Sequence, residues 1–149
     1  MQMSTKPEQA VATFKKRFNC AQSVLSIYAE ESGLDRETAL KLSCGFGAGM
    51  ARMGETCGAV TGAFMAIGLK FGAAVPGDSP AKLRTFELIG EFARQFEARH
   101  GSLLCKELLG FDMRTPEGKE AAKQPGSFDL CPKLVQSAVE ILEGIVPPN

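Results

Sequence analysis

Residues 50–72 read MARMGETCGAVTGAFMAIGLKFG, and this stretch indicates a buried helix. After its cysteine, apolar and small residues repeat at helical spacing along more than one face, which is typical of a helix covered on several sides. One stripe is Val60, Phe64, Ile67 and Phe71, and the other is Gly58, Gly62, Met65 and Leu69. Each glycine costs about 1 kcal/mol of helix propensity relative to alanine. We therefore expect another backbone to approach this helix closely.

The cysteine of this stretch, Cys57, is predicted to lie at the start of the helix. Thr56 precedes it, and a threonine hydroxyl can accept a hydrogen bond from the free amides of a first helical turn. Those amides and the helix dipole stabilise a thiolate relative to a thiol. The prediction is a central buried helix with a reactive sulfur at its positive end.

The rest of the chain also carries helical signals. Asn19, Asp35, Ser79, Ser102 and Asp129 are predicted helix caps, and each precedes an apolar pattern of helical spacing. A weaker pattern covers residues 5–17, and one or two turns are expected after Thr115. Because no segment alternates with a period of two, the predicted fold is all-α. We expect a single-domain bundle of about five to six helices over residues 1–149, with the glycine-rich helix at its centre.

The helix expected after Asp35 is predicted to pack directly against the central helix. Its core stripe would be Leu42, Phe46, Met50 and Met53. A face of small residues lies beside that stripe, consisting of Cys44, Gly47, Ala48 and Ala51. Small side chains on both helices would allow their backbones to approach closely.

The composition excludes several functional classes. The chain has 149 residues, 44% of them hydrophobic, and its 17 basic residues balance 17 acidic ones. This balance, with no Trp and one Tyr, argues against a nucleic-acid partner. The apolar run 56–69 is shorter than the roughly 20 residues that cross a membrane, so we expect no stable insertion. The start lacks the apolar segment of a signal peptide, which makes the cytoplasm the expected compartment.

The five cysteines form no short-spaced pair of the kind found in zinc knuckles or dithiol motifs. Four of them nevertheless share a predicted setting, because each falls in the first turn of an expected helix. They are Cys20 after Asn19, Cys57 after Thr56, Cys105 after Ser102 and Cys131 after Asp129. Cys44 differs, since it is expected within a helix. The alternative interpretation is four unrelated core cysteines, because free cysteine often packs as a small apolar residue.

At this level of detail the chain resembles the C_GCAxxG_C_C family of bacterial and archaeal proteins, which are described as redox-active. The matching pieces appear in order over roughly residues 15–145 and include FNCAQSV at 18–24, GETCGAVTG at 54–62, CKELLG at 105–110, TPEG at 115–118 and CPKLV at 131–135. The family label writes Gly-Cys-Ala, whereas this chain has Cys57-Gly58-Ala59. The resemblance implies a helical domain in which Cys20, Cys57, Cys105 and Cys131 are the redox-active or cofactor-binding residues.

Three functions stay open at this stage, and so does whether the protein is an enzyme. In the first, the four cysteines bind an iron–sulfur cluster or another thiolate-bound metal for electron transfer or sensing. In the second, they perform thiol–disulfide chemistry without metal, with Cys57 as the attacking thiol. In the third, the protein is a non-catalytic helical interaction protein. The first two require a redox partner protein, and a homo-oligomer stays open. His100 is expected to face solvent at a helix end.

Overall fold

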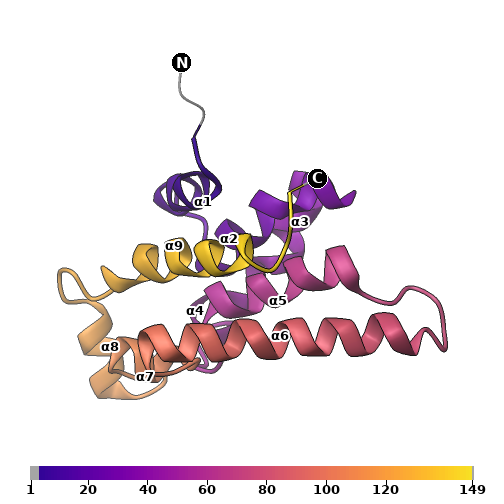
Figure 1. Cartoon of the computed structure of the whole chain (residues 1–149). Coiled ribbons are helices and arrows are strands. Elements are labelled where there is room, and N and C mark those ends of the chain that lie inside the picture. Colours follow the sequence, from indigo (N-terminus) through magenta and orange to yellow (C-terminus); the bar gives the residue numbers. More distant parts are fainter. Residues whose placement is uncertain (1–3, 149) are drawn as a thin grey trace.

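The computed structural model describes residues 4–148, and within them every regular element is helical (Figure 1). The α-helices are α1 (Lys6–Lys15), α2 (Cys20–Ala29), α3 (Arg36–Ser43), α4 (Gly47–Met50), α5 (Gly58–Phe71), α6 (Ser79–His100), α7 (Cys105–Leu109), α8 (Pro116–Ala122) and α9 (Leu130–Glu143). Short 3-10 turns cover Glu30–Ser32 and Cys44–Phe46. The all-α prediction is confirmed, although the helices are more numerous and several are shorter than expected.

Local sequence explains where several of these helices begin. Asn19 caps α2 through a reciprocal pair of hydrogen bonds with Gln22, and Asp35 caps α3 by accepting a hydrogen bond from the amide of Thr38. These caps satisfy amides that have no partner within the helix. The cap of α6 is Asp78 rather than the expected Ser79, because the Asp78 carboxylate accepts from the amide of Ala81.

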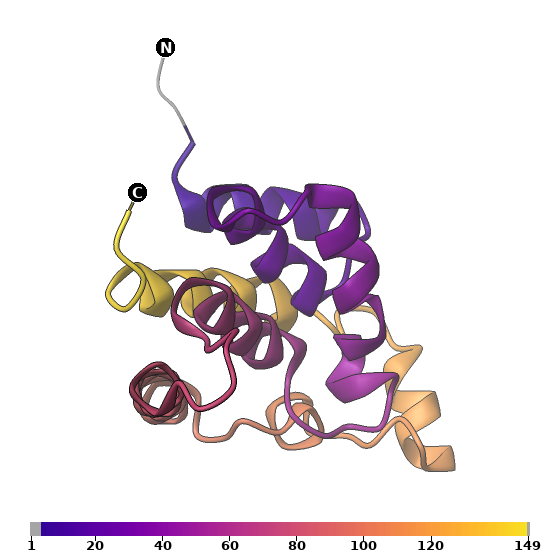
Figure 2. The same ribbon diagram turned by 90° about the vertical axis from the view of Figure 1, so that its right-hand side faces the viewer.

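Helix α5 lies at the centre, in contact with α2, α6 and α9 (Figures 1 and 2). Its buried residues are mainly small ones: Gly58, Ala59, Val60, Gly62, Ala63, Ala66 and Ile67. The predicted buried, glycine-rich central helix is therefore confirmed. Figure 2 shows α6 and α7 on one side of α5, and α2 and α3 on the other. None of the helices in residues 4–148 is both long and apolar enough to cross a membrane.

The main backbone partner of α5 is α2. The predicted partner, the segment after Asp35, meets only the start of α5, where a Cβ on Gly58 would lie 3.2 Å from the Phe46 carbonyl oxygen. A Cβ placed on Gly62 would lie 2.7 Å from the carbonyl oxygen of Ala21, and one on Gly58 would lie 2.9 Å from the Ala21 amide nitrogen. Real Cβ atoms do not approach other atoms so closely. The two glycines therefore let the backbones of α2 and α5 touch.

The single helix predicted over residues 35–53 was also wrong. After α3 the chain makes a 3-10 turn and then takes left-handed backbone angles at five consecutive residues, from Ala48 to Arg52. Leu42 and Met53, which were expected in the core, are 55% and 45% exposed. Each non-glycine residue in this conformation costs roughly 1–2 kcal/mol. Tertiary contacts compensate for that cost, because Gly49 packs against Cys105 and its carbonyl accepts from Glu55.

Candidate functional site: a four-cysteine cavity

The structure brings four of the five cysteines to one cavity of about 400 Å³. We call it the four-cysteine cavity, since Cys20, Cys57, Cys105 and Cys131 all line it. Their side chains are buried, with exposed fractions of 8%, 3%, 7% and 9% respectively. Cys44 is exposed and does not line the cavity. The separation of Cys44 from the other four, which the sequence indicated, is thus present in the structure.

Cys20 is the first residue of α2 and is held by the cap that precedes it. The Asn19 side chain accepts from the Gln22 amide at 3.0 Å and also donates to the Cys44 carbonyl at 2.8 Å. The absence of a side chain at Gly47 makes room for Asn19, because a Cβ there would lie 2.4 Å from its amide carbon. Asn19 therefore holds the start of α2 both to the helix itself, through Gln22, and to the neighbouring segment, through Cys44.

Cys57 occupies the capping position of α5 itself, so the expectation that Thr56 caps this helix was wrong. Thr56 instead forms an isolated β-bridge with Leu104. This pairing is extended by the Cys57 amide, which donates to the Leu103 carbonyl at 2.8 Å. Thr56 is thus committed to extended pairing rather than to the cap. Gly58, the next residue, allows Cys57 and Cys20 to approach, because a Cβ on it would lie 3.1 Å from the Cys20 Cβ.

Cys105 begins α7, and it is placed by the same pairing. Its amide donates to the Glu55 carbonyl at 2.7 Å, and the Lys106 amide donates to the Gly54 carbonyl at 3.2 Å. Ser102 does not cap the helix at the position expected. Its hydroxyl accepts from the Leu104 amide before α7 begins. Gly49, which has left-handed backbone angles, packs directly against the Cys105 side chain. Only glycine fits there, because a Cβ on Gly49 would lie 2.7 Å from the Cys105 Cβ.

Cys131 is the second residue of α9. Asp129 stands at the capping position but has helical backbone angles and makes no side-chain cap hydrogen bond, so its predicted capping role was wrong. The turn at residues 126–131 takes over this role, with the Cys131 amide donating to the Phe128 carbonyl at 3.0 Å. Cys131 is nevertheless in the first turn of its helix, as the sequence indicated.

Cys20 influences the pKa values of two neighbouring thiols, Cys57 and Cys131. Its S–H group donates toward the sulfurs of Cys131 and Cys57, and these hydrogen bonds, followed by burial, raise the pKa of Cys20 well above its ordinary value. The hydrogen bond from Cys20 is in turn the main cause that lowers the pKa of Cys57 and that of Cys131. Cys20 thus keeps its proton while a neighbouring sulfur becomes a thiolate.

The pKa values of the cavity thiols also depend on backbone amides and on burial. The first-turn amides of Ala59 and Val60 also lower the pKa of Cys57. This agrees with the expected effect of a helix start on a thiol. Cys105 behaves differently, because burial raises its pKa to about 12, with further contributions from the charges of Cys57 and Cys131. The four thiols therefore divide into two whose pKa is lowered, Cys57 and Cys131, and two whose pKa is raised, Cys20 and Cys105.

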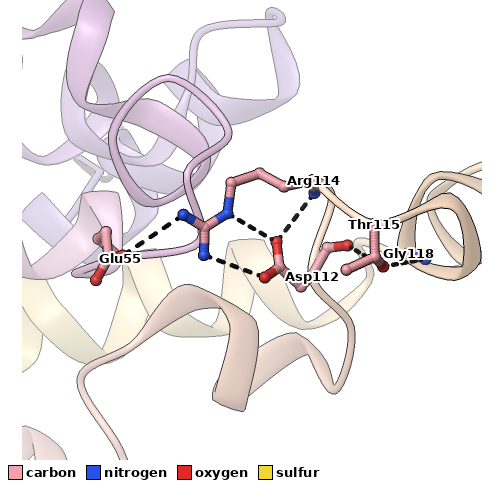
Figure 3. Close-up of polar contacts among 5 residues, drawn as sticks. All are labelled: Glu55, Asp112, Arg114, Thr115 and Gly118. Atoms are coloured by element: carbon pink, nitrogen blue, oxygen red, sulfur yellow. Dashed lines mark hydrogen bonds and ion pairs between the residues drawn. The ribbon is translucent and has the colours of Figure 1, made fainter.

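A polar network outside the cavity supports the segment that precedes Cys57 (Figure 3). The Arg114 guanidinium binds the Asp112 carboxylate through two nitrogens, at 3.2 and 3.1 Å, and lies 3.9 Å from the Glu55 carboxylate. Thr115 donates its hydroxyl hydrogen to the Asp112 carbonyl and accepts from the Gly118 amide. Figure 3 shows Arg114 between Glu55 and Asp112, so this network joins the Gly54–Glu55 turn to the loop before α8.

Sequence reasoning missed the apolar walls of the cavity. They are formed by Phe14, Phe18, Leu108, Leu109, Phe128 and Leu134. Several of these residues lie within four positions of a cavity cysteine, which was the available signal. His100 was expected to face solvent, but its ring packs against Phe96 and its Nε2 lies 2.8 Å from the Ser137 hydroxyl. It has no place among the residues that line the cavity.

The four-cysteine cavity has the donor chemistry of a metal centre, because thiolates bind structural zinc and iron–sulfur clusters. Among residues 4–148, however, no group of three or more Cys, His, Asp or Glu side chains is arranged to hold a metal ion. The side chains that could supply thiolate ligands are the four that line the cavity, Cys20, Cys57, Cys105 and Cys131.

Comparison with known families gives a match over most of the chain. Residues 18–145 match the family described as "Putative redox-active protein (C_GCAxxG_C_C)". The chain belongs to this family. All four cavity cysteines of this C_GCAxxG_C_C protein lie inside the matched region, and so do the Gly54–Glu55 turn and the network around Arg114. No curated protein and no solved structure matches the chain.

Proposed function

We propose that the C_GCAxxG_C_C protein binds an iron–sulfur cluster through Cys20, Cys57, Cys105 and Cys131, and that this centre transfers or senses electrons. The observation that carries the proposal is the convergence of four buried thiols, from four separate helix starts, on one cavity. Ligation by four cysteines is typical of such clusters. The redox description of the family supports a role of this kind.

The burial of the four thiols favours electron transfer over direct attack on a partner. Thiol–disulfide exchange requires one sulfur to reach the disulfide that it attacks. Here each of the four side chains is no more than 9% exposed. Electron transfer requires no contact between the sulfurs and the partner. A cluster also uses all four cysteines, whereas a single exchange reaction uses two.

The residues around the sulfurs would shape this centre. A bound cluster supplies reversible one-electron chemistry at a potential set by its charge, its hydrogen bonds and its exposure to solvent. The amides of Ala59 and Val60 stabilise negative charge at Cys57. Cys20 and Cys105 hold their protons in the metal-free protein, so their deprotonation makes binding depend on pH and releases protons.

Thiol–disulfide chemistry is the second candidate, and the hydrogen bonds among Cys20, Cys57 and Cys131 favour it. The thiolate of Cys57 would attack a small-molecule disulfide, form a mixed disulfide and release one thiolate. Cys20 would then attack the Cys57 sulfur, giving a Cys20–Cys57 disulfide, while its proton passes to the second leaving thiolate. Two protein thiols are oxidised and one substrate disulfide is reduced to two thiols.

Anaerobic purification of the full chain separates these functions. Iron and acid-labile sulfide in comparable amounts, with broad visible absorbance, are expected for a cluster. A colourless protein without iron, in which two thiols pair reversibly under a thiol–disulfide buffer, would overturn the cluster and support exchange. A protein that shows neither cofactor nor reversible thiol pairing would assign the chain to the helical interaction proteins and overturn both redox functions.

A further inference from the structure

A basic pocket lies next to the four-cysteine cavity. It has a volume of about 370 Å³ and is lined by Arg52, Met113, Lys119, Ala122, Lys123 and Phe128. Three of these residues are cations and none is a carboxylate, although the whole chain carries 17 basic and 17 acidic residues. The charged residues that line the pocket are therefore all basic, on a protein with no net charge.

The basic pocket and the four-cysteine cavity have one lining residue in common. Phe128 lines both, and its side chain is 38% exposed. Arg52 ends the left-handed run whose first residues, Ala48 and Gly49, line the cavity. Figure 1 shows α8, which carries Lys119, at the same end of the molecule as α7 and away from the loop between α5 and α6. A molecule seated on the basic pocket would thus lie beside the cysteine centre.

The character of the pocket fits a protein surface better than a small ligand. Small-molecule sites enclose most of their ligand and hold it with a few fixed polar groups. Arg52, Lys119 and Lys123 are all exposed. Lys123 makes an ion pair with Glu120 at 3.2 Å, but both side chains are more than 70% exposed, so solvent screens this pair. Exposed cations around one exposed aromatic ring are suited to steering and orienting a negatively charged partner.

We infer that an acidic electron-transfer protein docks on the basic pocket, with Phe128 at the contact, and exchanges electrons with the centre in the four-cysteine cavity. This inference rests on the proposed function, because it requires a centre that accepts and releases electrons. With a cluster held by the four cysteines, one electron would pass from the reduced partner to the oxidised centre, so that the partner would be oxidised and the centre reduced.

The test uses the cofactor-loaded full chain and a reduced, acidic plant-type ferredoxin as the probe. Stopped-flow absorbance gives the second-order rate of electron transfer at several salt concentrations. The double variant Lys119→Glu/Lys123→Glu is expected to lower this rate by about tenfold or more at low salt. The difference should shrink near 1 M salt, where the screening length is about 3 Å. The rate of the wild type should itself fall as salt increases.

The matched control is Lys82→Glu/Arg84→Glu, which makes the same change of charge on the half of α6 that lies far from α8 (Figure 1). It is expected to leave the rate near the wild-type value. An equal loss in both double variants, or no dependence on salt, would overturn the docking site. Saturable inhibition by citrate at constant ionic strength would assign the pocket to a small anion and also overturn it.

A redox titration with small dyes separates this inference from the proposed function. If each variant keeps the visible spectrum and the midpoint potential of the wild type, a change in rate reports docking alone. If the wild type shows a redox transition but the charge reversals do not change the rate of electron transfer, only the docking site is overturned. The absence of any redox transition in the wild type overturns the proposed function, and the docking inference with it.

Discussion

The backbone amide of Cys105 donates a 2.7 Å hydrogen bond to the carbonyl oxygen of Glu55. Two residues further along the chain from Glu55, Cys57 donates from its own amide to Leu103. These hydrogen bonds run in opposite directions between two short extended segments. They hold the cysteine before α5 beside the cysteine that begins α7, which are 48 positions apart in the sequence.

Replacing any cavity cysteine is expected to remove the cofactor. Bound iron should fall by about tenfold or more in each of four single variants: Cys20→Ser, Cys57→Ser, Cys105→Ser and Cys131→Ser. Mutating a residue that only hydrogen-bonds to a metal ligand already lowers metal affinity by about 10–100-fold, and these changes remove the ligands themselves. Iron analysis and the visible spectrum of anaerobic protein measure this. Cys44→Ser is the control, because Cys44 is exposed and lies outside the cavity, and it should retain iron. Loss of iron only in Cys44→Ser would contradict the assignment.

The cavity thiols of reduced, metal-free protein should titrate at different pH values. Cys57 and Cys131 have a lowered pKa, whereas the pKa of Cys105 is raised to about 12. Alkylation by iodoacetamide, followed by peptide mass spectrometry, should therefore reach its half-maximal rate at a lower pH for Cys57 or Cys131 than for Cys105. Burial slows the alkylation of all three thiols, so the quantity to compare is the order of their pH midpoints and not the absolute rates. The reverse order would contradict the described hydrogen bonds.

The raised pKa of Cys105 also predicts a loss of stability in alkali. Its thiol ionises near pH 9.0 in the unfolded chain but near 12 in the folded protein. The folded protein therefore binds the Cys105 proton more tightly than the unfolded chain does. The stability that this difference provides is fully present below pH 9.0 and is lost as the pH rises toward 12. Urea unfolding of metal-free protein across this range should show a smaller decline for Cys105→Ser. An identical decline in the variant would assign the effect to other groups.

Two glycines of α5 should respond to alanine with opposite signs. A Cβ on Gly62 would lie 2.7 Å from the Ala21 carbonyl oxygen, so Gly62→Ala should destabilise the protein by about 1–3 kcal/mol through overpacking. Gly68 has no atom within 4 Å of its would-be Cβ, so Gly68→Ala should stabilise it by roughly 0.5–1 kcal/mol. Urea unfolding measures both. Equal effects of the two changes would show that α2 and α5 are not in backbone contact.

Removing the hydroxyl of Tyr28 should not cost stability. Within the described residues, Tyr28 is 1% exposed and its hydroxyl has no hydrogen-bond partner. Tyr28→Phe relieves the desolvation of that group and should stabilise the protein by about 1 kcal/mol. The Lys6 ammonium group, 4.5 Å from the ring centre, can interact with phenylalanine equally. A destabilisation measured by thermal unfolding would contradict this and indicate a partner for the hydroxyl.

The sequence by itself determined the helical class, the buried position of α5 and the distinction between Cys44 and the other cysteines. These follow from local rules, because apolar periodicity, caps and glycines act within a few residues of one another. The capping pair of Asn19 and Gln22 and the buried Gly62 are examples. The resemblance of its motifs also identified the family before any tertiary contact was known.

Only the tertiary structure decided which backbones meet and where the chain leaves the helix. The left-handed run from Ala48 to Arg52 opposes local preference and is compensated by contacts with Cys105 and Glu55, which lie elsewhere in the chain. Thr56 likewise pairs with Leu104 instead of capping α5. The division of the thiols into two with lowered and two with raised pKa has the same origin. A sulfur's ionisation depends on its burial and on its neighbours in space, and neither is encoded within one helical turn.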